Sequence, residues 1–120
     1  MRIALNKTFG FEAAHWLPRF PESHKCRRMH GHSYRVDVVV EGEVDPTEGC
    51  LIDFGLIAKA FDPLLAALDH YVLNDVTGLE NPTAEVLAKW VYDRLKPSLP
   101  LLARVRIHET CTSSAEYAGL

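Results

Sequence analysis

The chain has few cysteines, little glycine or proline, and no long hydrophobic run. Its 120 residues contain 3 Cys, 7 Gly and 7 Pro, which excludes a disulfide scaffold, a collagen-like repeat and a low-complexity chain. The longest uninterrupted apolar stretch covers only residues 64–68, far too few to cross a membrane. The first residues, Met1-Arg2-Ile3, carry no apolar signal core. We therefore expect reduced thiols, a cytoplasmic location and no membrane partner.

Neither sign of charge dominates the chain. Lys and Arg total 13 and Asp and Glu total 16, so the formal net charge is -3 and offers no basic footprint for nucleic acid. Hydrophobic residues make up 48% and charged residues 24%, which is the balance of a globular domain. The length fits one such domain, and we predict a single domain over residues 1–120.

Alternation of apolar and polar residues predicts strands in two parts of the chain. Residues 2–15 and the stretch from 30 onwards each place apolar side chains at every second position, which is typical of half-buried strands. Residues 101–110 predict a third strand, and a short fourth strand is expected at 114–117. Each strand has one face that needs a covering layer.

The sequence between the second and third strands has apolar residues at helical spacing, which predicts helices that can cover this face. A first helix is expected from the N-cap Asp53 to about residue 68, and Pro63 should kink or split it. A second helix fits 84–96, with Thr83 as its N-cap. The order strand-strand-helix-helix-strand-strand predicts an α+β fold, an antiparallel four-stranded sheet with two helices packed on one face.

Three histidines should meet at one end of this sheet. His30 and His32 open the second strand and point to its apolar face, while His15 ends the first strand on its apolar face. If the two strands pair antiparallel, the three imidazoles gather and suit Zn²⁺ with a fourth position open for catalysis. The alternatives are three separately satisfied histidines, or a purely structural zinc, which usually takes four protein ligands.

The cysteines divide by their surroundings. Cys26 lies in Lys25-Cys26-Arg27-Arg28, where neighbouring cations favour a reactive thiolate, although an inert loop cysteine is the alternative. Cys50 and Cys111 stand near apolar strand residues and are expected to be small core side chains.

Two acidic positions are also candidates for chemistry. Asp69-His70 follows the last apolar helical residue, and a carboxylate beside an imidazole orients it for proton transfer; a histidine at a helix C-terminus is the alternative. Glu109 lies on an apolar strand face, where a planar nitrogen-rich ligand can satisfy it with two parallel hydrogen bonds. An ion pair with a nearby Arg is the alternative for Glu109.

Short segments in a fixed order along nearly the whole chain carry a family resemblance. They are Phe11-Glu12-Ala13-Ala14-His15, Cys26-x-x-x-His30-Gly31-His32-Ser33-Tyr34, Asp53-Phe54, Leu68-Asp69-His70, Leu73-Asn74, Asn81-Pro82-Thr83-x-Glu85 and Glu109-Thr110. Together they resemble the 6-pyruvoyltetrahydropterin synthase family. The Cys26-to-His30 spacing and the segment 109–112 look most like its bacterial branch, the 6-carboxy-5,6,7,8-tetrahydropterin synthases of queuosine biosynthesis.

The resemblance implies roles for named residues. It implies Zn²⁺ held by the three histidines already described, and Cys26 as general base or acid. Asp69 and His70 would complete a catalytic triad with Cys26. Glu109 would anchor the amino-pyrimidine edge of a pterin, assisted by the backbone or hydroxyl of Thr83. The implied fold is the tunnelling fold, in which small subunits join their sheets into a barrel with active sites at subunit interfaces, and the implied assembly is a homohexamer of two trimers.

The resemblance also implies a substrate and a set of rival reactions. The family substrate is 7,8-dihydroneopterin triphosphate, which this branch converts to 6-carboxytetrahydropterin, acetaldehyde and triphosphate. Lys25, Arg27 and Arg28 are candidates to attract the triphosphate, with a solvated loop as the equal alternative. The rival functions are 6-pyruvoyltetrahydropterin synthesis, aldolase cleavage of the side chain, and a non-catalytic zinc or pterin-binding module.

Overall fold

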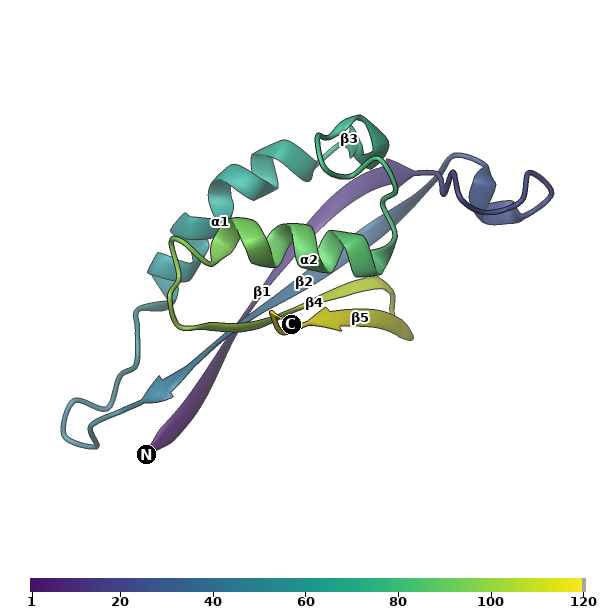
Figure 1. Ribbon diagram of the computed structural model, residues 1–120. Helices are drawn as coiled ribbons and strands as arrows, with labels where there is room; N and C mark the ends of the chain where they lie inside the picture. Colours follow the sequence, from purple (N-terminus) through teal and green to yellow (C-terminus); the bar gives the residue numbers. More distant parts are fainter. Residues whose placement is uncertain (120) are drawn as a thin grey trace.

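The fold is a twisted five-stranded sheet with two helices on one face. The computed structural model describes residues 1–119, and the molecule is elongated, 58 × 24 × 23 Å (Figure 1). The strands are β1 (Arg2–His15), β2 (His30–Glu43), β3 (Tyr71–Val72), β4 (Leu102–Thr110) and β5 (Ser113–Tyr117). Their order across the sheet is β3-β1-β2-β4-β5, and every neighbouring pair is antiparallel except β1 with β3.

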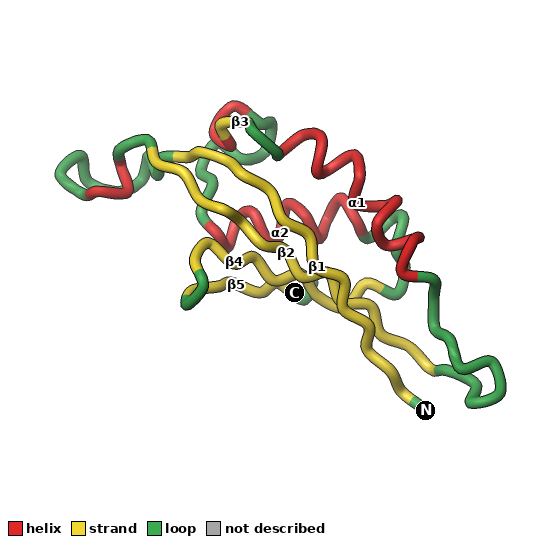
Figure 2. The backbone as a smooth tube through the Cα atoms, turned by 180° about the vertical axis from the view of Figure 1, so that it is seen from behind, coloured by secondary structure: helices red, strands yellow, loops and turns green. Residues whose placement is uncertain are grey.

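The helices begin where the sequence places capping side chains. The two long helices are α1 (Phe54–Leu68) and α2 (Ala84–Leu95), and the short 3₁₀ turns are η1 (Lys25–Arg27) and η2 (Leu73–Asp75). The Asp53 carboxylate accepts a hydrogen bond from the amide of Gly55, and the Thr83 hydroxyl accepts one from Val86. Both long helices lie on the same side of the sheet (Figures 1 and 2). No helix within residues 1–119 is long and apolar enough to cross a membrane.

The core fills the space between the sheet and the helices. Val36, Val38 and Val40 are fully buried on the covered face of β2, as the period of two requires. Phe61 of α1 stacks on Phe9 of β1, with ring centroids 4.2 Å apart. The covered face therefore presents a dry, apolar surface along the strands, up to the end where the histidines lie.

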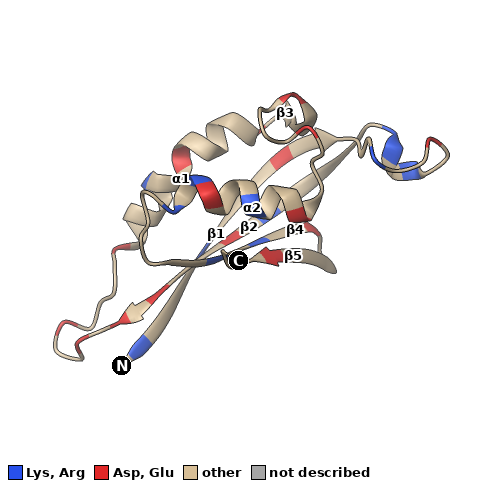
Figure 3. Cartoon of the chain, in the orientation of Figure 1, with Lys and Arg blue, Asp and Glu red and all other residues tan. Residues whose placement is uncertain are grey.

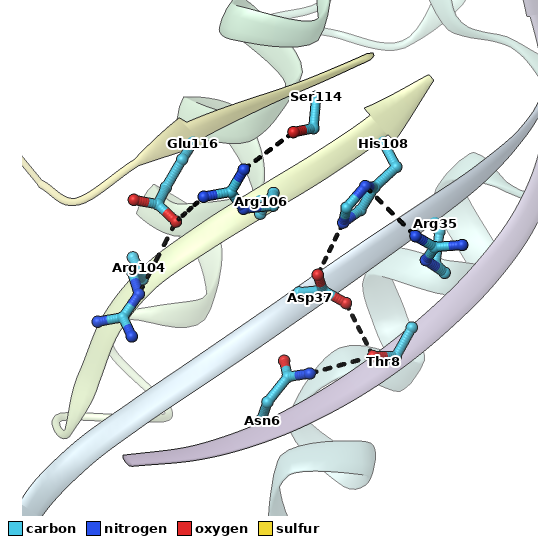
Figure 4. Close-up of polar contacts among 9 residues, drawn as sticks. All are labelled: Asn6, Thr8, Arg35, Asp37, Arg104, Arg106, His108, Ser114 and Glu116. Carbon is cyan, nitrogen blue, oxygen red and sulfur yellow. Dashed lines mark hydrogen bonds and ion pairs between the residues drawn. The ribbon is translucent and has the colours of Figure 1, made fainter. Parts of the chain in front are cut away.

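The opposite face of the sheet is polar and uncovered by helices. Thr8, Asp37 and His108 lie on three adjacent strands and are joined by hydrogen bonds, and Arg104 and Arg106 on β4 both contact Glu116 on β5 (Figure 4). We call this surface, formed by the outward side chains of β1, β2, β4 and β5, the open face. The charged groups of Asp37, His108, Arg104, Arg106 and Glu116 are thus paired across the strands.

Two expectations about the elements need correction. The sheet has five strands and not four, because Tyr71 and Val72 form the short strand β3, parallel to Ala13 and Ala14 of β1. A two-residue strand has no periodicity for a sequence pattern to reveal. Of the two outcomes expected at Pro63, a kink or a split, the split does not occur: helix α1 is continuous over 15 residues, and the buried side chains of Phe61 and Leu64 pack on either side of the proline.

The expectation for two of the cysteines is wrong. Cys50 and Cys111 are exposed and lie outside the core: Cys50 is in the loop between β2 and α1, and Cys111 is in the turn between β4 and β5. Only Cys26 is partly buried among the three.

Candidate active site

The register of β1 and β2 brings the three histidines together. His15 pairs with His30 across the strands, and Ala13 pairs with His32, so all three imidazoles project from the covered face at one end of the sheet. One nitrogen of each ring lies within 4.8 Å of the others. The ring centroids are 4.5 to 5.0 Å apart. The predicted gathering of the three histidines is confirmed, and we call this group the histidine cluster.

Hydrogen bonds to backbone carbonyls fix the orientation and the tautomer of the His15 and His30 rings. His15 Nδ1 lies 2.9 Å from the carbonyl oxygen of Pro82, and His30 Nδ1 lies 2.7 Å from that of Arg28. Because a carbonyl only accepts, each Nδ1 carries the proton and donates it, and each Nε2 keeps a free lone pair. This arrangement is typical of histidines that bind a metal.

Two nitrogens of the cluster are buried and have no hydrogen-bond partner within residues 1–119. They are Nε2 of His15 and Nε2 of His32. Glu109 Oε1 lies 3.2 Å from the second and 3.9 Å from the first, but neither contact has hydrogen-bond geometry. Leaving a buried polar atom unpaired costs about 1–3 kcal/mol, so these two atoms call for a ligand. A divalent metal ion fits them, since neutral imidazole nitrogen is a good ligand for such ions.

Burial of the cluster favours the neutral form of the His15 and His32 imidazoles. Burial lowers the pKa of His15 to about 4, although the Pro82 carbonyl acts in the opposite direction. Burial also lowers the pKa of His32, against the opposing charge of Glu109. Both rings are therefore deprotonated at neutral pH, the state in which imidazole binds a metal.

Cys26 and Glu109 share a pocket with the cluster. The pocket is lined by Lys25, Cys26, His30, His32 and Glu109. Cys26 is placed by its backbone: its amide donates to His24 Nδ1 at 3.0 Å, and its carbonyl accepts from the amide of Leu17 at 2.8 Å. Thiol, carboxylate and imidazoles therefore face one small space.

Glu109 faces imidazoles and not arginine. Its carboxylate pairs with His32 and His15, and it has no ion pair with a Lys or Arg in the part of the chain that the structure describes. The alternative of a Glu109–Arg ion pair is therefore wrong. A carboxylate on a half-buried strand end, with no cation to neutralise it, is available to a ligand that donates hydrogen bonds.

Asp69 and His70 form a dyad in a strained turn after α1. His70 Nδ1 lies 3.0 Å from Asp69 Oδ1, and the same oxygen accepts from the amide of Glu12 at 2.9 Å. The amide of His70 donates to the Glu12 carbonyl at 2.6 Å, which helps to hold His70 at a φ of 66°, unusual for a residue with a side chain. The Glu12 amide and the His70 ring hold the pKa of Asp69 below its ordinary value, although partial desolvation opposes them.

The dyad and Cys26 lie in different pockets of the same chain. His70 lines a pocket with Glu12, Ser33 and Tyr71, and this pocket shares only His32 with the pocket of Cys26. No hydrogen bond joins Cys26 to Asp69 or His70 among residues 1–119. Within residues 1–119, Cys26 therefore forms no hydrogen-bonded triad with Asp69 and His70.

The sequence did not reveal two groups near the cluster, the carbonyl of Pro82 and the hydroxyl of Tyr34. Thr83 caps α2 as predicted, but it is the preceding residue, Pro82, that contributes the carbonyl holding His15. The hydroxyl of Tyr34, a buried residue on β2, lies 3.1 Å from the same His15 nitrogen. A backbone carbonyl leaves no trace in residue types; the only signal for Tyr34 is a polar atom on an apolar strand face.

Comparison with known proteins gives this arrangement a family. The family model described as 6-pyruvoyl tetrahydropterin synthase matches residues 4–119. The chain belongs to the 6-pyruvoyl tetrahydropterin synthase family. A 6-carboxy-5,6,7,8-tetrahydropterin synthase from Synechocystis sp. is 45% identical over 117 residues, covering 92% of this chain and 89% of the relative. A dihydroneopterin monophosphate aldolase from Pyrococcus furiosus is 36% identical over 91 residues, covering 76% and 73%.

Solved structures agree with this assignment. The 6-pyruvoyl tetrahydropterin synthase of Caenorhabditis elegans superposes with a TM-score of 0.90 at 29% sequence identity. The match covers 100% of this chain and 97% of that structure. The α+β architecture with its two helices and five-stranded sheet is therefore that of the synthase family.

Proposed function

We propose that the protein is a zinc-dependent 6-carboxy-5,6,7,8-tetrahydropterin synthase. It converts 7,8-dihydroneopterin triphosphate and water to 6-carboxy-5,6,7,8-tetrahydropterin, acetaldehyde and triphosphate, and it serves queuosine biosynthesis. The observation that carries this proposal is the pair of buried Nε2 atoms of His15 and His32 that have no hydrogen-bond partner within residues 1–119, beside a pocket that His32 lines together with Cys26 and Glu109. The 45% identity to a relative of that name supports the choice of reaction.

His15, His30 and His32 would hold the zinc ion through their Nε2 atoms. A bound Zn²⁺ acidifies hydroxyl groups and stabilises negative charge that develops on oxygen. The Cys26 thiol, at the rim of the same pocket, takes and returns protons on the carbons of the substrate side chain.

Glu109 would fix the orientation of the pterin. Its carboxylate has no Lys or Arg partner within residues 1–119, so it accepts two parallel N–H bonds from an amino-pyrimidine edge. Thr83 assists through its backbone, because its hydroxyl is engaged in capping α2. With the ring held at this edge, the side chain at pterin C6 reaches toward Cys26 and the histidine cluster.

The triphosphate would lie over the loop that carries η1. In Figure 3 several segments of this loop are blue, the colour of Lys and Arg, beyond the ends of β1 and β2. They include Lys25, Arg27 and Arg28. Arg27 is partly held in place by a bond to the Phe20 carbonyl at 3.3 Å. This local positive charge compensates for a chain whose net charge is -3.

Asp69 and His70 would act on the substrate of a neighbouring copy. The dyad is exposed, with 77% of the His70 side chain accessible, and lies in a separate pocket from Cys26. We propose a homohexamer, built as two trimers, in which each active site combines Cys26 of one copy with His70 of another. The site is then complete only in the assembly.

Mixing two inactive variants tests this shared site. Cys26→Ala and His70→Asn are each expected to be inactive alone, and co-refolding them restores activity in those interfaces that receive both intact residues. A mixture that stays inactive, although mixed oligomers are present by native mass spectrometry, would contradict a site shared between copies.

The reaction itself is tested by product analysis. Zinc-loaded protein is incubated with 7,8-dihydroneopterin triphosphate, and acetaldehyde and the pterin product are followed by mass spectrometry. A 6-carboxytetrahydropterin together with acetaldehyde supports the proposal. A 6-pyruvoyl product or simple side-chain cleavage replaces it with a sibling reaction, and the identity to a dihydroneopterin monophosphate aldolase makes the second of these the specific alternative. Tight pterin binding without turnover identifies a non-catalytic module.

A further inference from the structure

A hydroxyl group lies inside the apolar wall of the active site. Tyr34 is only 2% exposed, its ring stacks on Phe11 with centroids 5.0 Å apart, and on the covered face of β2 it stands between His32 and the buried Val36. A phenylalanine would fill the same space. Burying a hydroxyl without a partner costs about 1–3 kcal/mol, so its presence requires an interaction that uses it.

That interaction is with the most buried residue of the histidine cluster. The Tyr34 oxygen lies 3.1 Å from Nδ1 of His15, whose side chain is fully inaccessible. The same nitrogen lies 2.9 Å from the Pro82 carbonyl. The two oxygens come from different parts of the fold, β2 and the segment before α2, and meet at one atom of the imidazole.

The chemistry of the two oxygens decides the tautomer. If Nδ1 lacked its proton, its lone pair would face the lone pairs of the Pro82 carbonyl at 2.9 Å, which is repulsive. With the proton on Nδ1, the carbonyl accepts it directly and the tyrosine oxygen accepts it as a second, shared acceptor. Two acceptors on either side of one N–H resist rotation of the ring about its bond to Cβ. Nε2 is then left with its lone pair in a fixed direction.

We propose that Tyr34 is a positioning residue that, with the Pro82 carbonyl, fixes His15 as the Nδ1–H tautomer before any metal binds. The protein would thus preorganise one ligand of the site instead of relying on the metal to select it. The ring of Tyr34 adds to this, because it packs edge-on against both His15 and His32, with centroids 5.9 and 5.4 Å away. This inference deepens the proposed metal site and rests on it only for the consequence in metal affinity.

Imidazole ¹⁵N NMR on metal-free protein at neutral pH tests the tautomer. In the wild-type chain we expect His15 to be almost wholly the Nδ1–H form. In Tyr34→Phe the carbonyl remains but the second acceptor is lost, so His15 signals should broaden or shift toward a mixture of tautomers. Tyr92→Phe is the matched control, because it removes a tyrosine hydroxyl from α2, whose ring packs on Tyr117 away from the cluster.

A zinc titration against a chromophoric chelator tests the consequence. Tyr34→Phe should bind Zn²⁺ about 10-fold more weakly than Tyr92→Phe, within the roughly 10- to 100-fold range for loss of a group that orients a ligand. The unfolding temperatures of the two metal-free variants report any general loss of packing. Equal zinc affinities in the two variants, or a wild-type His15 that is a mixture of tautomers, would overturn the proposal.

The two readouts separate this inference from the proposed function. A wild-type chain with a fixed Nδ1–H tautomer that loosens in Tyr34→Phe, but that binds no zinc, contradicts the zinc enzyme and leaves the positioning by Tyr34 standing. A chain that binds zinc tightly with a mixed His15 tautomer contradicts the positioning and leaves the enzyme standing. If Tyr34→Phe does not fold, the wild-type spectrum alone still decides the tautomer.

Discussion

Histidines on the two faces of the sheet differ in burial and in hydrogen bonding. On the covered face, His15 is inaccessible and its Nε2 has no hydrogen-bond partner within residues 1–119. On the open face, His108 bonds through Nε2 to Asp37 at 2.7 Å, and its Nδ1 lies 3.4 Å from Arg35 (Figure 4). Both residues lie on long strands of the same sheet. A buried imidazole nitrogen without a hydrogen-bond partner, and not the presence of a histidine, therefore identifies the candidate ligand-binding site.

The largest expected difference comes from removing one histidine from each face. His30→Ala should lose its metal and all measurable turnover, because two imidazoles do not hold a catalytic zinc ion firmly. We expect metal affinity to fall by more than the roughly 100-fold that loss of an orienting group costs. Metal content by elemental analysis and turnover by mass spectrometry measure both effects.

The matched change on the open face is His108→Ala. It should keep metal and activity, since the His108 ring bonds to Asp37 and Arg35 on the open face and lines neither pocket described above. Equal loss of metal in the two variants would contradict the separation of the faces. If His30→Ala loses its fold together with its metal, by circular dichroism, the metal is mainly structural.

The next effect concerns chemistry without metal binding. Cys26→Ala should lower kcat by roughly 10²- to 10⁴-fold, the usual contribution of a positioned acid or base. Zinc content should not change, because the thiol is not one of the three groups whose nitrogens cluster. Cys50→Ala is the control, an exposed cysteine at the other end of the strands. A Cys26 variant with the same kcat as the control would contradict the role of Cys26 as acid or base.

Much of the fold was predictable because burial repeats along the chain. The period of two in β1 and β2 places Val36 and Val38 inward, and the capping side chains of Asp53 and Thr83 mark where both helices begin. Strand β3 was not predictable, because it forms only where the turn after α1 meets the edge of β1. The continuity of α1 through Pro63 likewise depends on tertiary packing, which overrides local preference.

The candidate site divides along the same line. The gathering of His15, His30 and His32 followed from strand periodicity and antiparallel pairing alone. The Pro82 carbonyl could not be foreseen, since every residue has a carbonyl and only the fold decides which one faces His15. The separation of Cys26 from Asp69-His70 into two pockets is also a property of the folded chain, because their distance in sequence says nothing about which face each occupies.

The pH dependence of the free energy of unfolding of the metal-free protein tests the burial of His15 on the covered face. The folded-state pKa of His15 is about 4 and its ordinary value is 6.5, so the unfolded chain binds more protons between these values. The stabilising contribution of neutral His15 is present above pH 6.5 and is lost as the pH falls toward 4, in total roughly 3 kcal/mol. Urea unfolding in the presence of a chelator measures it. A free energy of unfolding that is flat across this interval would contradict the buried, neutral ring.

The smallest effect is expected on the open face, from Asp37→Asn. Burial acts to raise the pKa of Asp37, but the bonds from His108 and Thr8 outweigh it and hold that pKa below its ordinary value. The carboxylate therefore stabilises the fold above its ordinary pKa, and this contribution is lost as the pH falls through the lowered folded-state value.

Asparagine at position 37 can still accept a hydrogen bond from Thr8 but loses the charge, so we expect the free energy of unfolding to fall by about 1 kcal/mol at neutral pH. The difference between variant and wild type should shrink as the pH falls below the ordinary Asp pKa of about 4, a window below that of His15. Urea unfolding at both pH values measures the difference, and zinc affinity serves as the control, because a change in it would mean that the open face and the histidine cluster are not independent.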